Sequence, residues 1–154
     1  MFFKKKKKDN HPDNWMSIES RVYNAISRND TARLKDLFNL GASPNMILNK
    51  RDNERPIHAA AAFGNRSTID YLIEQGADPL AGIKLHAFCV LSPSGFAKMM
   101  NKPENSEHLK KIEQARCKQL ANNGKKVPHF DKEYRPPLCY LSDRRQSSLP
   151  PRRP

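Results

Sequence analysis

Histidines and cysteines are the residues of this sequence best suited to chemistry, because both side chains bind zinc. His86 and Cys89 form an H-x-x-C pair. The remaining candidate ligands are widely scattered: His108, Cys117, His129 and Cys139. A compact structural zinc site needs ligand pairs at short, regular spacing. The spacing here fits no such site, so we expect neither a metal nor another cofactor.

The sequence motifs of common enzymes do not occur in this chain. It contains no Gly-rich phosphate loop, no nucleophile elbow and no paired carboxylate motif. We therefore predict a non-enzymatic protein with no catalytic residues. Its three cysteines are an odd number at wide spacing, which favours a reducing compartment over a disulfide framework. No run approaches the ~20 apolar residues of a membrane-spanning helix and no export signal is recognisable, so we expect a cytoplasmic protein.

The C-terminal stretch "RRQSSLP" carries a pattern that favours modification. Arg144 and Arg145 precede Ser147, as basophilic kinases prefer, and Arg145 lies three residues before Ser148. The stretch resembles the phosphoserine motif that 14-3-3 adaptors read. Ser147 and Ser148 are thus candidate phosphorylation sites, and a phospho-dependent adaptor is a candidate partner.

Charge is distributed unevenly along the 154 residues, whose net charge is +12. Residues 1–16 carry +3, residues 17–97 carry +1 and residues 98–154 carry +8. The neutral centre also holds most of the regular apolar pattern. We therefore predict a basic extension over residues 1–16, a folded domain over residues 17–124 and a Pro/Arg-rich tail without stable structure over residues 125–154.

The basic ends support an alternative function. Clustered Lys and Arg residues can hold the phosphates of nucleic acid or of an anionic membrane. Aromatic residues are not interleaved with these charges, however, and no groove-reading motif is present. Solvated tails or a localisation signal explain the same composition, and such a signal would place the protein in the nucleus.

Two parts of the folded domain repeat each other at an interval of 35 residues. Shifting the chain by that distance places "YNAISRNDTARLKDLFNLGASPN" on "HAAAAFGNRSTIDYLIEQGADPL". Each unit contains two apolar segments at helical spacing. An interval of this length with two such segments predicts stacked helix pairs, none of which can bury its apolar face alone.

Helix boundaries can be predicted for both units. Ser17 can cap the first helix, and Gly41 ends the second. In the next unit Pro56 suits the first turn of a helix, and we expect Gly64 to close that helix in a left-handed conformation. Gly76 ends the helix that follows.

The second unit resembles the ankyrin repeat, whose pattern is approximately TPLHxAAxxGHxxxVxxLLxxGADxN. The matching positions are Pro56, Ile57, His58, Ala60, Ala61, Gly64, Ile69, Leu72, Ile73, Gly76, Ala77 and Asp78. Arg55 stands where the family has Thr, and "NKRDNERP" resembles the finger between repeats, lengthened by two residues. The resemblance covers residues 17–80. It implies an all-α solenoid of about three stacked helix-turn-helix repeats, in which His58 is a buried turn histidine.

The repeat register beyond Leu80 is open between two alignments. "IKLHAFCVLS" aligns with "RPIHAAAAFG" through His86 and His58, whereas "SPSGFAKMMN" aligns with it through Pro93 and Pro56. Both belong to a degenerate third repeat.

Two further helices are predicted in this third repeat. Ser92 and Pro93 form a helix start in either alignment. We expect Ser106 to begin a long, basic final helix that caps the stack, and Gly124 to end it.

The resemblance also implies a function, since ankyrin repeats bind other proteins through a concave surface. Finger tips and exposed positions of the inner helices line that surface. On this chain those positions are Ser27, Arg28, Arg51, Asp52, Glu54, Ala62 and Phe63. We therefore expect a protein-interaction module, an adaptor or scaffold.

Two points of this interpretation have alternatives. Phe63 can instead pack under the third repeat as part of the core. Small ankyrin proteins with basic tails also resemble effectors that intracellular bacteria deliver into host cells, which would place this protein in the host cytosol.

Overall fold

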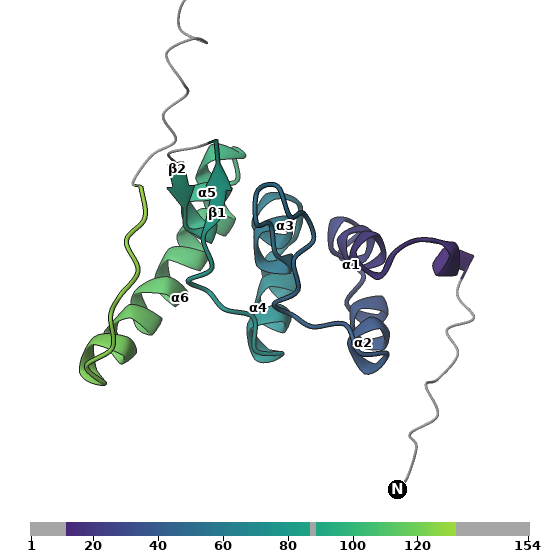
Figure 1. The fold of residues 1–154 in the computed structure, drawn as a ribbon, viewed down its shortest axis with the longest axis horizontal. Helices are drawn as coiled ribbons and strands as arrows, with labels where there is room; N and C mark the ends of the chain where they lie inside the picture. Colours follow the sequence, from purple (N-terminus) through teal and green to yellow (C-terminus); the bar gives the residue numbers. More distant parts are fainter. Residues whose placement is uncertain (1–11, 87–88, 132–154) are drawn as a thin grey trace, which may run out of the picture.

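Three helix pairs stand in a row in the computed structural model, which describes residues 12–86 and 89–131. The elements are η1 (Pro12–Trp15), α1 (Ile18–Ser27), α2 (Thr31–Asn39), α3 (Pro56–Phe63), α4 (Arg66–Glu74), β1 (Ile83–Leu85), β2 (Cys89–Leu91), α5 (Pro93–Met99) and α6 (Pro103–Asn122). The first helices of the pairs, α1, α3 and α5, pack against one another along the row (Figure 1). The prediction of stacked helix-turn-helix units is confirmed.

Polar side chains cap the helix starts. Ser17 accepts a hydrogen bond from the Ser20 N–H at 3.3 Å, so it caps α1 as predicted. Asp30, Asn65 and Ser92 cap α2, α4 and α5 in the same way. Each cap satisfies a backbone N–H that has no partner within its own helix.

Glycines follow the second helix of the first two pairs. Gly41 and Gly76 have φ values of +105° and +92°. Glycine enters this left-handed region at little steric cost, so the chain can leave the helix there. Both predicted helix ends are confirmed.

Gly64 ends α3 in an extended conformation, with φ −75° and ψ 170°, so the predicted left-handed cap is wrong. A Cβ atom at this position would lie 2.7 Å from the Ala60 carbonyl oxygen, so close packing excludes a side chain there. The Asn105 amide donates hydrogen bonds to the carbonyl oxygens of Gly64 and Ala61, at 2.9 and 3.2 Å. These hydrogen bonds tie the end of α3 to α6, and so the second helix pair to the third.

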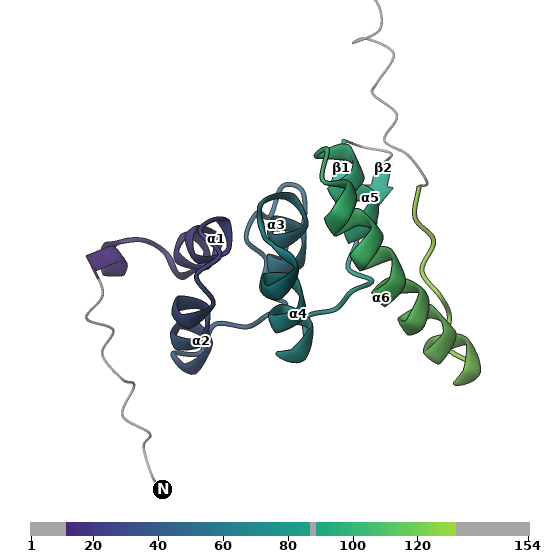
Figure 2. The same cartoon turned by 180° about the vertical axis from the view of Figure 1, so that it is seen from behind.

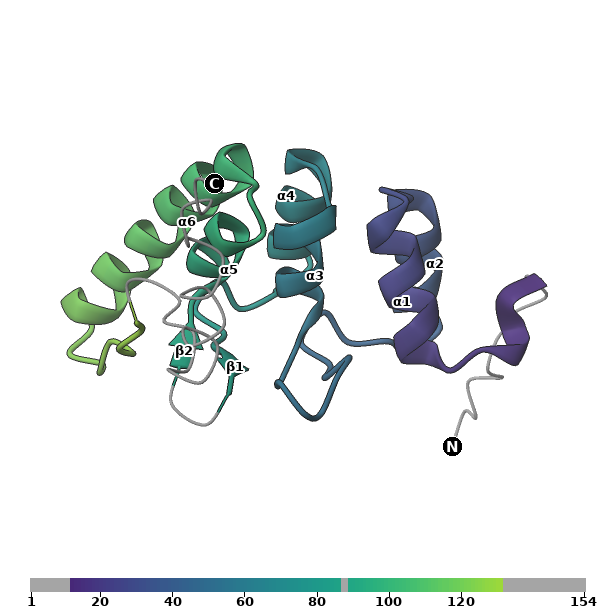
Figure 3. The same ribbon diagram turned by 90° about the horizontal axis from the view of Figure 1, so that it is seen from above.

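The alanines of α3 form the centre of the core. Each of the four alanines at residues 59–62 has an exposed fraction of 1% or less. Figure 3 shows α3 between α1 and α5, and it contacts both. Small side chains let the helices approach closely, and larger apolar residues of the second helices complete the core: Leu34, Leu37, Ile69 and Leu72.

Two fingers connect the helix pairs and project to the same side of the helices (Figure 3). The first finger, residues 48–54, is closed by backbone hydrogen bonds between Asn49 and Glu54. Asn53 has a φ of 56°, a left-handed conformation that asparagine tolerates better than most residues.

The second finger contains the antiparallel strands β1 and β2, with Ile83 opposite Leu91. These two are the named strands of the described residues, so the stack itself is helical as predicted. The Lys84 N–H donates to the Asp52 carbonyl oxygen at 2.8 Å, which links the two fingers.

The third repeat follows the alignment of Pro93 with Pro56, because each proline begins the first helix of its pair. The competing segment "IKLHAFCVLS" lies in and around the second finger. The expected helix start at Ser92 and Pro93 is confirmed, since the Ser92 hydroxyl accepts from the Gly95 N–H at 3.3 Å.

Helix α6 begins at Pro103 rather than at Ser106, so the predicted start is wrong by three residues. Proline suits the first turn of a helix because its missing N–H would have no partner there. The Ser106 hydroxyl instead donates to the Ser94 carbonyl oxygen at 2.9 Å. Gly124, with φ +65°, follows the end of α6 as predicted.

Residues 125–131 return from the end of α6 to the second finger (Figure 1). The Asp131 N–H donates to the Val90 carbonyl oxygen, and its carboxylate accepts from the Val90 N–H, both at 2.9 Å. The proposed division of the chain at residues 16 and 124 stays a prediction. None of the helices in residues 12–86 and 89–131 has the length and apolar character that crossing a membrane requires.

Candidate protein-binding face

The first two predicted binding residues lie at the end of α1. Ser27 and Arg28 are both exposed. The Ser27 hydroxyl donates to the Asn24 carbonyl oxygen at 3.0 Å, which ties it to its own helix. The guanidinium of Arg28 extends the polar surface at the turn between α1 and α2.

The first finger places three predicted residues at different depths. Arg51 is exposed, whereas Asp52 and Glu54 are partly buried. The Asp52 carboxylate accepts from the Asn49 amide at 3.3 Å. Burial raises the pKa of Glu54, and the negative charge of Asp52 raises it further.

The two predicted residues of α3 differ sharply in exposure. Ala62 is only 1% exposed, so its predicted place on an open surface is wrong. The reason is that α3 is enclosed by α1 and α5, and the position of α5 could not be predicted while the third repeat had two alignments. Phe63 is 43% exposed and lies outside the buried core.

Phe63 packs against the first repeat rather than under the third. Its ring meets the ring of Tyr23 edge to face, with the centroids 5.9 Å apart and an interplanar angle of 66°. Aromatic pairs favour this geometry. The two rings therefore form one aromatic surface across α1 and α3.

Tyr23 also lines a cleft between α1 and the first finger. The cleft encloses about 230 Å³. Its lining residues are Met16, Glu19, Ser20, Tyr23, Asn24, Leu48 and Glu54. The pKa of Tyr23 is raised by partial burial and by the negative charge of Glu54, so the two side chains are electrostatic neighbours.

Sequence reasoning missed Glu19 and Tyr23 as members of this face. The 35-residue shift places Tyr23 on His58, which is completely buried. The ring of His58 is covered by the chain that follows its repeat, through the Ala81 carbonyl oxygen and the ring of Phe96. The alignment therefore predicts a buried residue at Tyr23, and no sequence signal indicated its partial exposure.

His58 has the buried structural role that was predicted. Its Nδ1 accepts from the Arg55 N–H at 3.1 Å, and its Nε2 donates to the Ala81 carbonyl oxygen at 2.8 Å. Burial lowers its pKa to about 4, partly opposed by the Ala81 hydrogen bond. A neutral ring thus ties α3 to the chain that leads into the second finger.

A larger hollow of about 840 Å³ opens between the end of α4, residues 76–80 and α6. Helix α6 is longer than the other helices and runs obliquely past α4 (Figure 2). Ile73, Leu80 and Leu120 are among the lining residues, and none of the predicted binding residues is.

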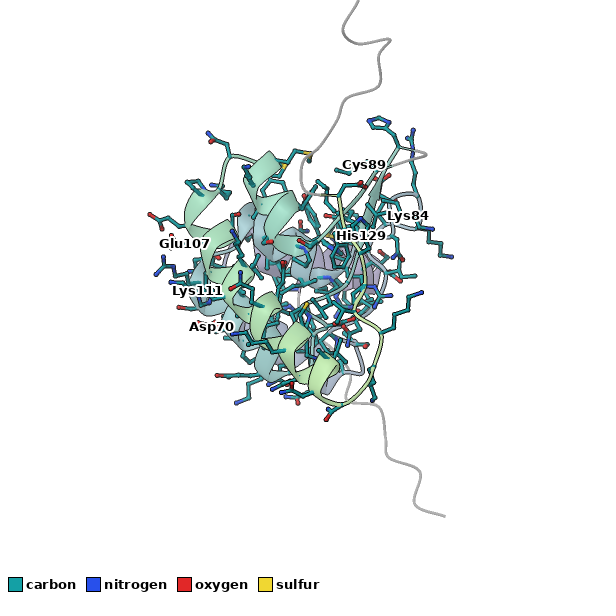
Figure 4. The ribbon with its side chains drawn as sticks, turned by 90° about the vertical axis from the view of Figure 1, so that its left-hand side faces the viewer. Asp70, Lys84, Cys89, Glu107, Lys111 and His129 are labelled. Carbon is teal, nitrogen blue, oxygen red and sulfur yellow. The ribbon has the colours of Figure 1, made fainter. Side chains whose placement is uncertain are left out.

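Titratable side chains near α6 lie on two separate sides of the stack. Seen from the α6 end, Asp70, Glu107 and Lys111 lie on one side, whereas Lys84, Cys89 and His129 lie on the other (Figure 4). Asp70 pairs with His108 of α6 at 2.6 Å.

The residues that the structure describes hold no group of three or more His, Cys, Asp or Glu side chains able to bind a metal ion. Cys89 and Cys117 are free thiols. Cys139, Ser147 and Ser148 lie outside the described residues.

Paired helices stacked in a row, with fingers between the pairs, define a helical repeat protein. The model of the family "Ankyrin repeats (many copies)" matches residues 22–73, from within α1 to within α4. Residues 22–73 are therefore ankyrin repeats, and the third helix pair continues the stack beyond them. No curated protein matches the chain. Ankyrin repeats are typically non-enzymatic binding modules for other proteins.

Proposed function

We propose that this chain is a protein-interaction module that binds its partner through a face made of α1, the exposed end of α3 and the first finger. The aromatic pair of Tyr23 and Phe63 is the observation that carries the proposal. Phe63 is 43% exposed although its ring already packs against that of Tyr23.

An aromatic pair with one exposed and one partly buried member favours binding, because water solvates the rings poorly. A partner that covers the rings gains the hydrophobic contribution, and aromatic and Arg residues often dominate interface energies. Arg51 on the first finger and Arg28 at the end of α1 are both exposed and supply polar contacts. The proposed face therefore has an apolar centre with a polar rim, as protein interfaces commonly do.

Affinity capture from cell lysate tests this proposal. The full chain should be used as bait beside the Phe63→Ala and Arg51→Glu variants, with captured proteins quantified by mass spectrometry. We expect each variant to lose the proteins that the unchanged chain captures specifically. Thermal melting of both variants should stay close to that of the unchanged chain, because neither side chain belongs to the buried core.

Matched variants on α2 and α4, the outer helices of the first two pairs, show whether a similar substitution away from the proposed face also weakens capture. Tyr71→Ala removes an aromatic ring from α4, and Lys35→Glu reverses an exposed charge on α2. Both should retain the captured proteins. If the control variants lose the captured proteins to the same extent, the proposed binding face is contradicted.

Binding of nucleic acid or anionic membrane through the basic termini is the alternative, and the net charge of +12 supports it. Charge-driven binding to phosphates weakens steeply as salt rises, whereas binding through apolar contacts does not. Capture repeated over a range of salt concentrations therefore separates the two functions. A role as an effector would make a host protein the partner, and the same capture from host lysate tests it.

A further inference from the structure

A partly buried carboxylate, that of Glu54, lies in the cleft between α1 and the first finger and has no cationic partner among the described residues. The Glu54 backbone closes the finger, because its N–H donates to the Asn49 carbonyl oxygen at 3.0 Å and its carbonyl oxygen accepts from the Leu48 N–H at 2.7 Å. Within residues 12–86 and 89–131 its carboxylate forms neither a hydrogen bond nor an ion pair. The backbone of Glu54 therefore closes the first finger, and its carboxylate is available to bind a partner.

The surroundings of this carboxylate disfavour its charge in the free protein. Burial and the nearby Asp52 carboxylate both raise the pKa of Glu54. A cation entering the cleft would lower this pKa and so favour the charged carboxylate. The cleft is therefore electrostatically complementary to a cation.

The cleft also has apolar and aromatic walls, supplied by Met16, Leu48 and Tyr23. Its volume of about 230 Å³ lies below the ~300–1,000 Å³ of typical small-molecule pockets, so it suits one long side chain. Arginine combines an apolar stem with a planar cation. That cation stacks on aromatic rings and binds carboxylates through two parallel hydrogen bonds.

We propose that this cleft holds an arginine side chain of the partner protein. The stem lies against Met16 and Leu48, and the guanidinium donates to Glu54 beside the ring of Tyr23. Glu19 at the same cleft adds a second negative charge. This inference rests on the proposed function and specifies the chemistry of the partner: an extended segment whose arginine enters the cleft while a neighbouring apolar residue covers Phe63.

Selection from a library of random displayed peptides, with the full chain as bait, tests the inference. The net charge of +12 repels basic peptides in general, so enrichment of arginine at one position requires a local site. We expect such enrichment. In a selected peptide, replacement of that arginine by citrulline, a neutral analogue of similar shape, should weaken binding at least about tenfold, because a charge-assisted hydrogen bond is lost.

Protein variants assign the effect to Glu54. Glu54→Gln should weaken binding of the arginine peptide by a similar factor and should not change affinity for the citrulline peptide. Glu74→Gln changes the net charge equally at an exposed position on α4 and should leave both affinities unchanged. The citrulline comparison uses the unaltered protein, so it stands even where a variant folds poorly.

Two results distinguish this inference from the proposed function. Selected peptides that lack an enriched arginine, or that bind Glu54→Gln as tightly as the unchanged chain, would overturn the arginine site. If the Phe63→Ala variant no longer binds the same peptides, that result would still support binding at the proposed face. Peptides indifferent to both variants would contradict both.

Discussion

The buried ring of His58 makes the stability of the stack depend on pH. The side chain is 0% exposed, and burial lowers its pKa to about 4 in the folded chain. In the unfolded chain the same ring has the ordinary pKa of about 6.5. Between these two values the unfolded chain binds a proton that the folded chain does not, so stability is complete above about pH 6.5 and falls as pH decreases toward about 4.

The size of this effect follows from the shift. Each pKa unit corresponds to about 1.36 kcal/mol, so the full difference of roughly 2.5 units is worth about 3 kcal/mol. Between pH 7 and pH 5 the expected loss is about 2 kcal/mol. This is a substantial part of the ~5–15 kcal/mol by which native domains are stable.

Urea denaturation at a series of pH values measures the effect. Glu54 and Glu113 complicate it, because burial raises the pKa of each and their contribution increases stability as pH falls. The comparison must therefore be made against a His58→Gln variant, which keeps both acids. The unchanged chain should lose about 2 kcal/mol more than the variant between pH 7 and pH 5. Equal pH dependence of the two proteins would refute the buried neutral histidine, and NMR of the ring should show a proton on Nε2 at pH 7.

Three further predictions concern packing and the tail. Ala60→Leu forces a larger side chain into the 0% exposed centre of α3 and should lower stability by about 1–3 kcal/mol in thermal or urea unfolding; an unchanged melting curve would contradict the close helix packing. Gly64→Ala places a Cβ 2.7 Å from a carbonyl oxygen and should lower the free energy of unfolding by about 1–3 kcal/mol. The Cβ of Gly95→Ala would lie 3.6 Å from its nearest neighbours, so this control should be neutral or stabilising by up to about 1 kcal/mol. The reverse order of the two variants in urea unfolding would refute the steric account. A peptide of residues 140–154 phosphorylated on Ser148 should bind a 14-3-3 adaptor more tightly than the unmodified peptide in a fluorescence polarisation titration, and equal affinities would remove the idea.

The helix ends that depend on local chemistry could be predicted from the sequence. Ser17 caps α1, and Gly41 and Gly76 turn the chain after α2 and α4, because each acts within one helical turn of its own position. The helical spacing of the apolar positions likewise indicated the paired helices. In these places local preference and the final fold agree.

Features set by distant residues could not be predicted. The extended conformation of Gly64 goes with hydrogen bonds from Asn105, a residue 41 positions further along the chain. The burial of Ala62 depends on α5, whose register had two equal alignments. The start of α6 is a different case, because Pro103 and Ser106 are both good local signals for a helix start.

The binding face was predicted in part. Phe63 and Arg51 are exposed where the repeat pattern placed them. The cleft was not anticipated, because it brings α1 together with a finger about thirty residues away in the chain. Whether this face binds a partner stays a prediction.

Amide chemical-shift mapping of the isotope-labelled full chain, titrated with a partner captured by it, tests the central claim most directly. We predict that the shifted amides cluster on α1, on the first finger and at the end of α3, around Tyr23, Arg51 and Phe63. The amides of the outer helices α2 and α4 should stay unchanged. Shifts confined to the outer helices would contradict the proposed face, and shifts confined to residues 1–11 and 132–154 would instead support charge-driven binding through the termini.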